Sequence, residues 1–299
     1  MQLGEGRKLQ RCTIVTFVPI ILCKFFIPLL LNPFQELKMK IKDVIQEIEK
    51  YAPLNLQETY DNAGVQVGNI SRDATGVLLS LDITEEVIEE AYNLGCNIIV
   101  VHHPLIFKPL SSITGKTYIE RCIVEAIQKE IVIYAAHTNL DNVIHGVSHR
   151  IAQKIGLQNI CILSPDVNTS IQSGSGVIGE LFTDEEELSF LCRLKDVFEL
   201  KVLKHSPLRN KKIKRVAICG GSGAFLIQDA ITAGADIFVT GEAKYNDFYD
   251  VEKNILLSVI GHYESEVCTK EIFFEIITKK FPNFAVHFSN INSNPVNYL

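Results

Sequence analysis

The sequence lacks the features that mark several classes of protein. It has no excess of basic residues, with 29 lysines and arginines against 35 acidic residues and a net charge of −6, so composition gives no signal for a nucleic-acid partner. Its eight cysteines include no CxxC pair, which argues against a thiolate zinc site or a disulfide framework. This pattern is typical of the reducing cytoplasm. We therefore predict a cytoplasmic protein in which histidines and carboxylates would hold any metal.

The N-terminal segment lacks a coherent targeting signal. Residues 11–34 are mostly apolar, but Lys24 interrupts them and no small-residue cleavage site follows. An amphipathic helix pattern begins only at Met39. We expect residues 1–38 to be an extension outside the fold, and we expect membrane attachment only if this segment is translated and retained.

Strand and helix patterns alternate along the rest of the chain. Apolar runs at 75–83, 98–101 and 131–136 predict buried strands, and amphipathic helix patterns lie between them. The same alternation resumes in the C-terminal third. It predicts an α/β fold with βαβ units and largely parallel sheets.

Composition changes between residues 163 and 185, where serine, glycine and asparagine are frequent. We predict a linker there. It would join a first α/β domain at 39–162 to a second at 186–299, with C-terminal elements free to pack back on the first.

Histidines and carboxylates follow three of the predicted strands. Parallel α/β sheets bind ligands at the carboxyl ends of their strands, so these side chains are candidates for one site. A single histidine is often a satisfied core residue, but this grouping favours a metal site. The candidates are His102 and His103 after strand 98–101, His137 and Asp141 after strand 131–136, and His262 and Glu266 after strand 256–260.

Imidazole and carboxylate ligands suit zinc, iron, manganese or nickel. Neighbouring side chains on a strand point to opposite faces, but Pro104 ends the strand and lets His102 and His103 face one centre. His262 and Glu266 are four residues apart, a spacing that helical metal sites use. Five ligands are too many for one catalytic zinc and suit two ions about 3.5–4 Å apart. This set is His102, His103, Asp141, His262 and Glu266.

Three other features have two interpretations each. The glycine-rich turn at 219–223 could cradle a phosphate through backbone N–H groups or simply connect a strand to a helix, and it lacks the lysine of a Walker motif. We expect His149 at the surface, whereas His145 either supports the site from behind or is itself a metal ligand. Glu264 faces away from His262 on a helix, which favours a solvated carboxylate over a metal ligand.

Together the motifs resemble the dinuclear metal-centre proteins, the Nif-three-like family, often labelled GTP cyclohydrolase 1 type 2 homologs. The resemblance spans about residues 39–299 and implies two associated α/β domains, with helices flanking mixed, mostly parallel sheets and two divalent metals in the cleft between them. It also implies a homohexamer and the five metal ligands His102, His103, Asp141, His262 and Glu266. The motifs that carry it are "YDNAGVQVGN", "VVHHPLIF", "HTNLD", "VAICGGSG", "TGEAKYND" and "GHYESE".

Two features depart from the family pattern. Asn246 stands where members often have a histidine after the tyrosine of the "TGxxKY" element, which puts proton transfer at that position in doubt. The chain between residues 157 and 215 is also too short for the inserted domain that some larger relatives carry.

The predicted function is a metal-dependent hydrolase for a small molecule, either a nucleotide or another phosphorylated compound. Two divalent ions would activate water for attack on a phosphate ester or a purine-ring carbon, with His137 or Glu264 relaying protons. The alternative is a non-catalytic metal-binding protein that regulates or binds a partner, because no nucleophile–base pair or nucleotide fingerprint accompanies the predicted ligands.

Overall fold

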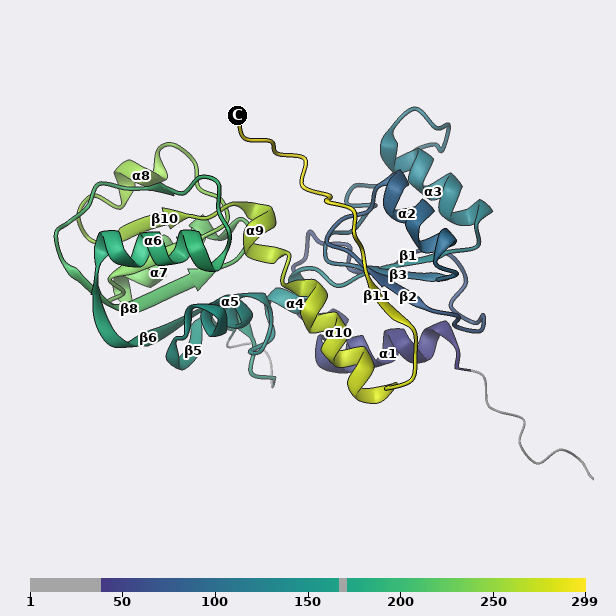
Figure 1. The fold of residues 1–299 in the computed structure, drawn as a ribbon, viewed down its shortest axis with the longest axis horizontal. Helices are drawn as coiled ribbons and strands as arrows, with labels where there is room; N and C mark the ends of the chain where they lie inside the picture. The colour runs from purple at the N-terminus through teal and green to yellow at the C-terminus, as the bar shows by residue number, and fades with distance from the viewer. Residues whose placement is uncertain (1–38, 167–170) are drawn as a thin grey trace, which may run out of the picture. The chain divides into compact units, whose positions relative to one another are not determined.

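Two mixed β-sheets with flanking helices make up the fold, which confirms the predicted α/β class (Figure 1). The computed structural model describes residues 39–166 and 171–299. The predicted extension at 1–38 lies outside the described residues. Within the described part of the chain, no helix has the length and apolar character needed to cross a membrane.

The first sheet has five strands in the order β1, β4, β3, β2, β11. All neighbouring pairs are parallel except β1 with β4, so a single antiparallel strand closes one edge. The three central strands are buried throughout, as expected when helices cover both faces of a parallel sheet. The strands are β1 (Gly64–Val67), β2 (Val77–Leu79), β3 (Ile98–Val101), β4 (Val132–Ala135) and β11 (Val286–Phe288).

Alternating side chains of these strands belong to two apolar clusters, one on each face of the sheet. Leu78 and Ile99 pack with the apolar stripes of α2 (Glu85–Asn93) and α3 (Tyr118–Gln128). Leu79 and Val100 belong to the cluster that includes α1 (Ile41–Tyr51) and α10 (Thr269–Lys280). The cluster that includes α1 and α10 continues into the second sheet, so it forms a core common to the two sheets.

The second sheet has six strands in the order β5, β6, β8, β9, β10, β7, of which β8, β9 and β10 are parallel. The strands are β5 (Gln158–Pro165), β6 (Gly174–Glu186), β7 (Lys204–His205), β8 (Lys212–Cys219), β9 (Ile237–Thr240) and β10 (Leu256–Val259). The remaining helices are α4 (Thr138–Asp141), α5 (Val147–Ile155), α6 (Glu187–Val197), α7 (Ile227–Thr232), α8 (Asp247–Asp250) and α9 (His262–Glu266), with 3₁₀ turns at Leu54–Leu56 and Gly223–Leu226.

The segment 163–185, which composition predicts to be a linker, contains the end of β5 and most of β6. Its glycines reflect close strand pairing. A Cβ at Gly174 would lie 2.3 Å from the carbonyl oxygen of Ser164 on the neighbouring strand, so a larger residue would separate the two. Residues 163–165 and 174–185 are therefore strand within the stretch predicted as a linker. The division into domains at 39–162 and 186–299 stays a prediction.

The chain returns to the first sheet after completing the second. It leaves β10 through α9, continues into α10 against α1, and ends the sheet with β11 beside β2. Because α9 lies between β10 and α10, its residue Glu266 lies near the carboxyl ends of β3 and β4, beside His102 and His103. This path is what gathers the histidines and carboxylates described next.

Candidate metal centre

His102 and His103 follow β3, and their rings lie close together, with centroids 5.0 Å apart. The backbone N–H groups of both residues donate to the same acceptor, the carbonyl oxygen of Leu81, at 3.2 Å each. Such shared pairing ends the regular alternation of a strand. Both rings therefore face one side, as the position of Pro104 predicts.

His137 and Asp141 are the two ends of a single helical turn. His137 precedes α4, and its carbonyl oxygen accepts the backbone N–H of Asp141 at 3.1 Å. Residues four apart on a helix lie on the same face, so the turn presents both side chains to the rings of His102 and His103.

His262 and Glu266 occupy successive turns of α9, where the helical spacing predicted from the sequence is observed. His262 Nε2 lies 3.0 Å from Glu266 Oε2. Glu266 is 4% exposed, and its two oxygens also face His103 at 2.9 Å and His102 at 3.7 Å. A buried carboxylate thus lies at the centre of three imidazoles.

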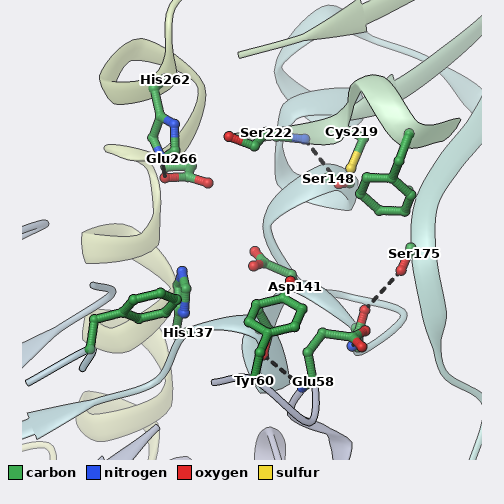
Figure 2. A pocket seen from close by; sticks show the side chains of 16 residues that line it. Glu58, Tyr60, His137, Asp141, Ser148, Ser175, Cys219, Ser222, His262 and Glu266 are labelled. Atoms are coloured by element: carbon green, nitrogen blue, oxygen red, sulfur yellow. Dashed lines mark hydrogen bonds and ion pairs between the residues drawn. The ribbon is translucent and has the colours of Figure 1, made fainter. Parts of the chain in front are cut away.

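The structure brings all five predicted ligands, together with His137, into three overlapping groups. Within each group the candidate ligand atoms lie within 4.8 Å of one another. Figure 2 shows His137, Asp141 and Glu266 facing one space. Glu264 belongs to none of these groups. The groups are His102, His103 and His137; His103, His262 and Glu266; and His102, Asp141 and Glu266.

All four histidines direct Nδ1 away from the cluster and towards an oxygen atom. A hydrogen bond at Nδ1 fixes the ring and leaves Nε2 for the cluster, the arrangement usual for metal-binding histidines. The Nδ1 partners are Ala136 O for His102 (2.8 Å), Asp82 Oδ1 for His103 (2.6 Å), Asp61 Oδ1 for His137 (2.7 Å) and Glu242 Oε1 for His262 (3.0 Å).

His102 shows most clearly that the cluster fits a cation. A carbonyl oxygen can only accept, so His102 Nδ1 donates its proton to Ala136 O, and Nε2 is the ring nitrogen left to bind a proton or a metal ion. His102 Nε2 is fully buried and has no hydrogen-bond partner within residues 39–166 and 171–299. It lies 3.6 Å from Asp141 Oδ1 and 3.7 Å from Glu266 Oε1. A buried acceptor that faces two carboxylate oxygens calls for a positive charge between them.

The protonation of each histidine in the cluster affects the charge of the carboxylates that it faces. Burial opposes protonation of His103, but its hydrogen bonds to Asp82 and Glu266 outweigh burial and raise its pKa to about 10. Burial likewise opposes ionisation of Glu266, yet the facing rings of His102, His103 and His262 hold its pKa well below the usual range. Both pKa shifts show that positive charge among these side chains is stabilised. Either protons or a metal cation can supply that charge.

The glycine-rich turn after β8 packs closely against the cluster. At Gly221, which has a φ of +57°, a Cβ would lie 2.1 Å from Glu266 Oε1, so only glycine fits beside this carboxylate. Three backbone N–H groups of the turn already donate to hydroxyl groups, which favours the structural interpretation of the turn. These bonds join Gly220 to Ser148, Gly221 to Ser265 and Gly223 to Thr240.

Sequence reasoning missed the role of three carboxylates that orient histidines, which are Asp61, Asp82 and Glu242. Asp82 follows β2 closely, so the same rule about strand ends could have found it. Asp61 lies in a loop whose pattern indicates only an ordinary turn, although its side chain is fully buried. Glu264, whose role as a proton relay stays a prediction, accepts a hydrogen bond from Asn294 at 3.3 Å.

Residues 39–295 match the family model Duf34/NIF3, described as NGG1p interacting factor 3. The chain belongs to the Duf34/NIF3 family. Two relatives named GTP cyclohydrolase 1 type 2 homolog support this assignment. The one from Clostridium perfringens is 38% identical, covering 76% of this chain and 87% of the relative. The one from Lactococcus lactis is 35% identical, covering 82% and 93%.

Solved structures show the same Duf34/NIF3 fold. The Staphylococcus aureus hypothetical protein SA1388 has a TM-score of 0.81 and 31% identity, covering 87% of this chain and 99% of its own. A Bacillus cereus protein related to NIF3 also has a TM-score of 0.81, at 23% identity, and supports the fold alone. The family resemblance seen in the sequence motifs is confirmed.

Proposed function

We propose that this Duf34/NIF3 chain is a hydrolase that depends on divalent metal ions held by the histidine–carboxylate cluster. The observation that carries the proposal is the convergence of Nε2 of His102, His103 and His262 on the buried carboxylate of Glu266, with His102 Nε2 left unpaired between Glu266 and Asp141. Bound divalent ions would supply Lewis-acid activation of a water molecule.

Two ions are proposed, because the ligand atoms fall into overlapping groups and not into one set of three or four. His102, His103, Asp141, His262 and Glu266 are the proposed ligands. We add His137, first predicted as a proton relay, because its ring is held by Asp61 in the same way as the other three are held. The mixture of imidazole and carboxylate suits zinc, iron, manganese or nickel.

A cavity of about 590 Å³ adjoins the cluster and is large enough for a small-molecule substrate. Among its lining residues, Cys219 is the strongest intrinsic nucleophile. Burial raises the pKa of its thiol to about 12, so it stays protonated near neutral pH and does not compete with water as the attacking group. A nucleotide or other phosphorylated small molecule is the substrate class predicted from the motifs.

His102→Ala tests the proposal directly. We expect the purified variant to lose most of its bound metal and any hydrolysis of a nucleotide and phosphoester panel, because it removes the unpaired buried nitrogen. Metal content is measured by mass spectrometry and folding by circular dichroism. His205→Ala, which removes an exposed histidine outside the cluster, is the control and should keep both. Full metal occupancy without turnover on any substrate would favour the non-catalytic alternative.

A further inference from the structure

The cavity beside the cluster contains recognition chemistry that the metal ligands do not use. Its lining combines exposed aromatic rings with carboxylates and neutral hydroxyl groups, and includes neither lysine nor arginine (Figure 2). Polyanionic ligands are normally bound by such cations. Away from the proposed metal ions, the lining therefore offers no side-chain cation to a negatively charged part of a ligand.

Three aromatic side chains line this cavity and are unusually exposed. Tyr60 is 66% exposed, Phe107 42% and Phe225 69%, and the rings of Tyr60 and Phe107 meet edge to face with centroids 6.5 Å apart. Large apolar rings gathered at a cavity are typical of binding sites for planar ligands, against which they stack.

Glu58 contributes a carboxylate that no cation neutralises. No lysine, arginine or histidine of the described chain forms an ion pair with it. Its Oε1 accepts a hydrogen bond from Asn142 Nδ2 at 3.1 Å, and its backbone N–H donates to Thr138 Oγ1 at 2.9 Å. Asn142 is itself fixed, since its Oδ1 accepts from Ser175 Oγ at 3.1 Å. The carboxylate is thus held in place by neutral groups and keeps further acceptor capacity.

A planar ring with N–H groups on one edge satisfies all three features. Its faces would stack on the aromatic side chains, and its N–H edge would pair with a carboxylate that otherwise lacks a strong donor. Lys204 and Lys244 line a neighbouring cavity that shares Ser222 and Phe225 with this one. Any anionic substituent of the ligand is better accommodated there than near Glu58.

We propose that this cavity binds a planar heteroaromatic ring, neutral or cationic, that donates N–H hydrogen bonds to Glu58 and stacks on Tyr60 and Phe225. The inference rests on the proposed function, because it names the substrate class of the same cavity. It concerns recognition only, so it is tested by binding without turnover.

The probe is 2-aminoquinoline, whose amino group and protonated ring nitrogen present two parallel N–H donors. Its matched control is 2-methylquinoline, which has the same shape without the paired donors. Calorimetric titration of the purified protein should show binding of 2-aminoquinoline and at least about tenfold weaker binding of the control, the effect of losing charge-assisted hydrogen bonds.

Two pairs of variants separate the contributions of charge and stacking. Glu58→Gln should weaken 2-aminoquinoline binding by about tenfold or more, whereas Glu252→Gln, at an exposed position outside the cavity, should not. Phe225→Ala should weaken binding of both probes, whereas Phe182→Ala, at another exposed phenylalanine, should change neither. Equal affinity for the two probes, no binding at all, or unchanged binding by Glu58→Gln would each overturn the proposal.

A titration of the protein after metal removal by a chelator distinguishes this inference from the proposed function. Glu58 is not in any of the candidate metal groups, so its preference for 2-aminoquinoline should persist. Donor-dependent binding by a protein that never takes up metal would refute the metal-dependent hydrolase and support the ring site. Loss of the donor preference on metal removal would place the probe on the metal and overturn the ring site.

Discussion

Glu266 is the residue on which the cluster depends most. Its Oε2 lies within 3.0 Å of Nε2 of both His103 and His262, and its Oε1 faces His102. A single side chain thus contacts three histidine rings that are far apart in the sequence. The backbone beside Glu266 has no room for a side chain, so a substitution at Gly221 would disturb the carboxylate.

Gly221→Ala should damage the cluster more than the fold. The new Cβ would meet Glu266 Oε1 at 2.1 Å and the positive φ would add strain, so we expect metal content to fall sharply. Gly234→Ala is a matched control, because it also has a positive φ but no atom within 4 Å of its Cβ. Both should lose about 1 to 2 kcal/mol of stability from the backbone term. Equal metal content in the two variants would contradict the steric explanation.

Asp82→Asn should weaken metal binding without abolishing it. The carboxylate accepts from His103 Nδ1 at 2.6 Å and from Ser293 Oγ at 2.7 Å, so it fixes the ring from outside the cluster. We expect metal affinity to fall by about 10- to 100-fold, as is usual when a partner of a metal-binding histidine is changed. Competition with a coloured chelator measures it. Asp229→Asn, at an exposed position on α7, should leave affinity unchanged.

At the level of elements, the sequence predicts the site better than it predicts the second sheet. Strand ends at β3, β4 and β10 are clear because each is a short apolar run followed by a histidine-bearing segment. β6 is not clear, because glycines required by close pairing resemble those of a loop. The orienting role of Asp61 depends on a contact with His137 across the fold, which no local pattern encodes.

A carboxylate in the first turn of α3, that of Glu120, anchors the loop that precedes the helix. The side chain of Glu120 accepts from the backbone N–H and hydroxyl of Thr114 and from the backbone N–H of Lys116, and these bonds lower its pKa to about 2. Its stabilising effect is therefore complete above its usual pKa of 4.5 and is lost as pH falls towards 2.

Glu120→Gln tests the contribution of this carboxylate through the pH dependence of stability. The variant should unfold at lower urea concentration than the parent protein at pH 6, and the difference should narrow steadily between pH 4.5 and pH 2.5. Glu252→Gln, at an exposed position, should show no such pattern. A difference in the urea midpoint that is independent of pH would mean that the charge of Glu120 is not what stabilises the loop.

For the whole molecule, the central fact is that the first sheet is completed by the C-terminal strand. β11 pairs with β2, and Ser289 N–H donates to Leu79 O at 2.9 Å beyond the strand. This strand is a C-terminal element of the kind that we expected to pack back on the first domain, and the division into domains stays a prediction. The homohexamer implied by the family resemblance stays a prediction.

Ending the chain after Asn283 should destabilise the entire fold, because it removes β11 and exposes the edge of β2. We expect a loss of about 2 kcal/mol or more, together with reduced metal content. A chain that ends after Ile291 retains β11 and is the matched control. Thermal unfolding followed by circular dichroism compares them. If the two truncations had the same melting temperature, the pairing of β11 with β2 would contribute little to stability.

The late position of α9 and β11 has a consequence for how the protein is made. A ribosome releases the N-terminal histidines long before His262 and Glu266 are synthesised. The growing chain thus contains His102, His103 and His137 before Glu266 is synthesised. β2 likewise lacks its neighbour β11 until the end of synthesis. Assembly of the complete cluster therefore has to wait for the synthesis of α9, whereas the group of His102, His103 and His137 is present earlier.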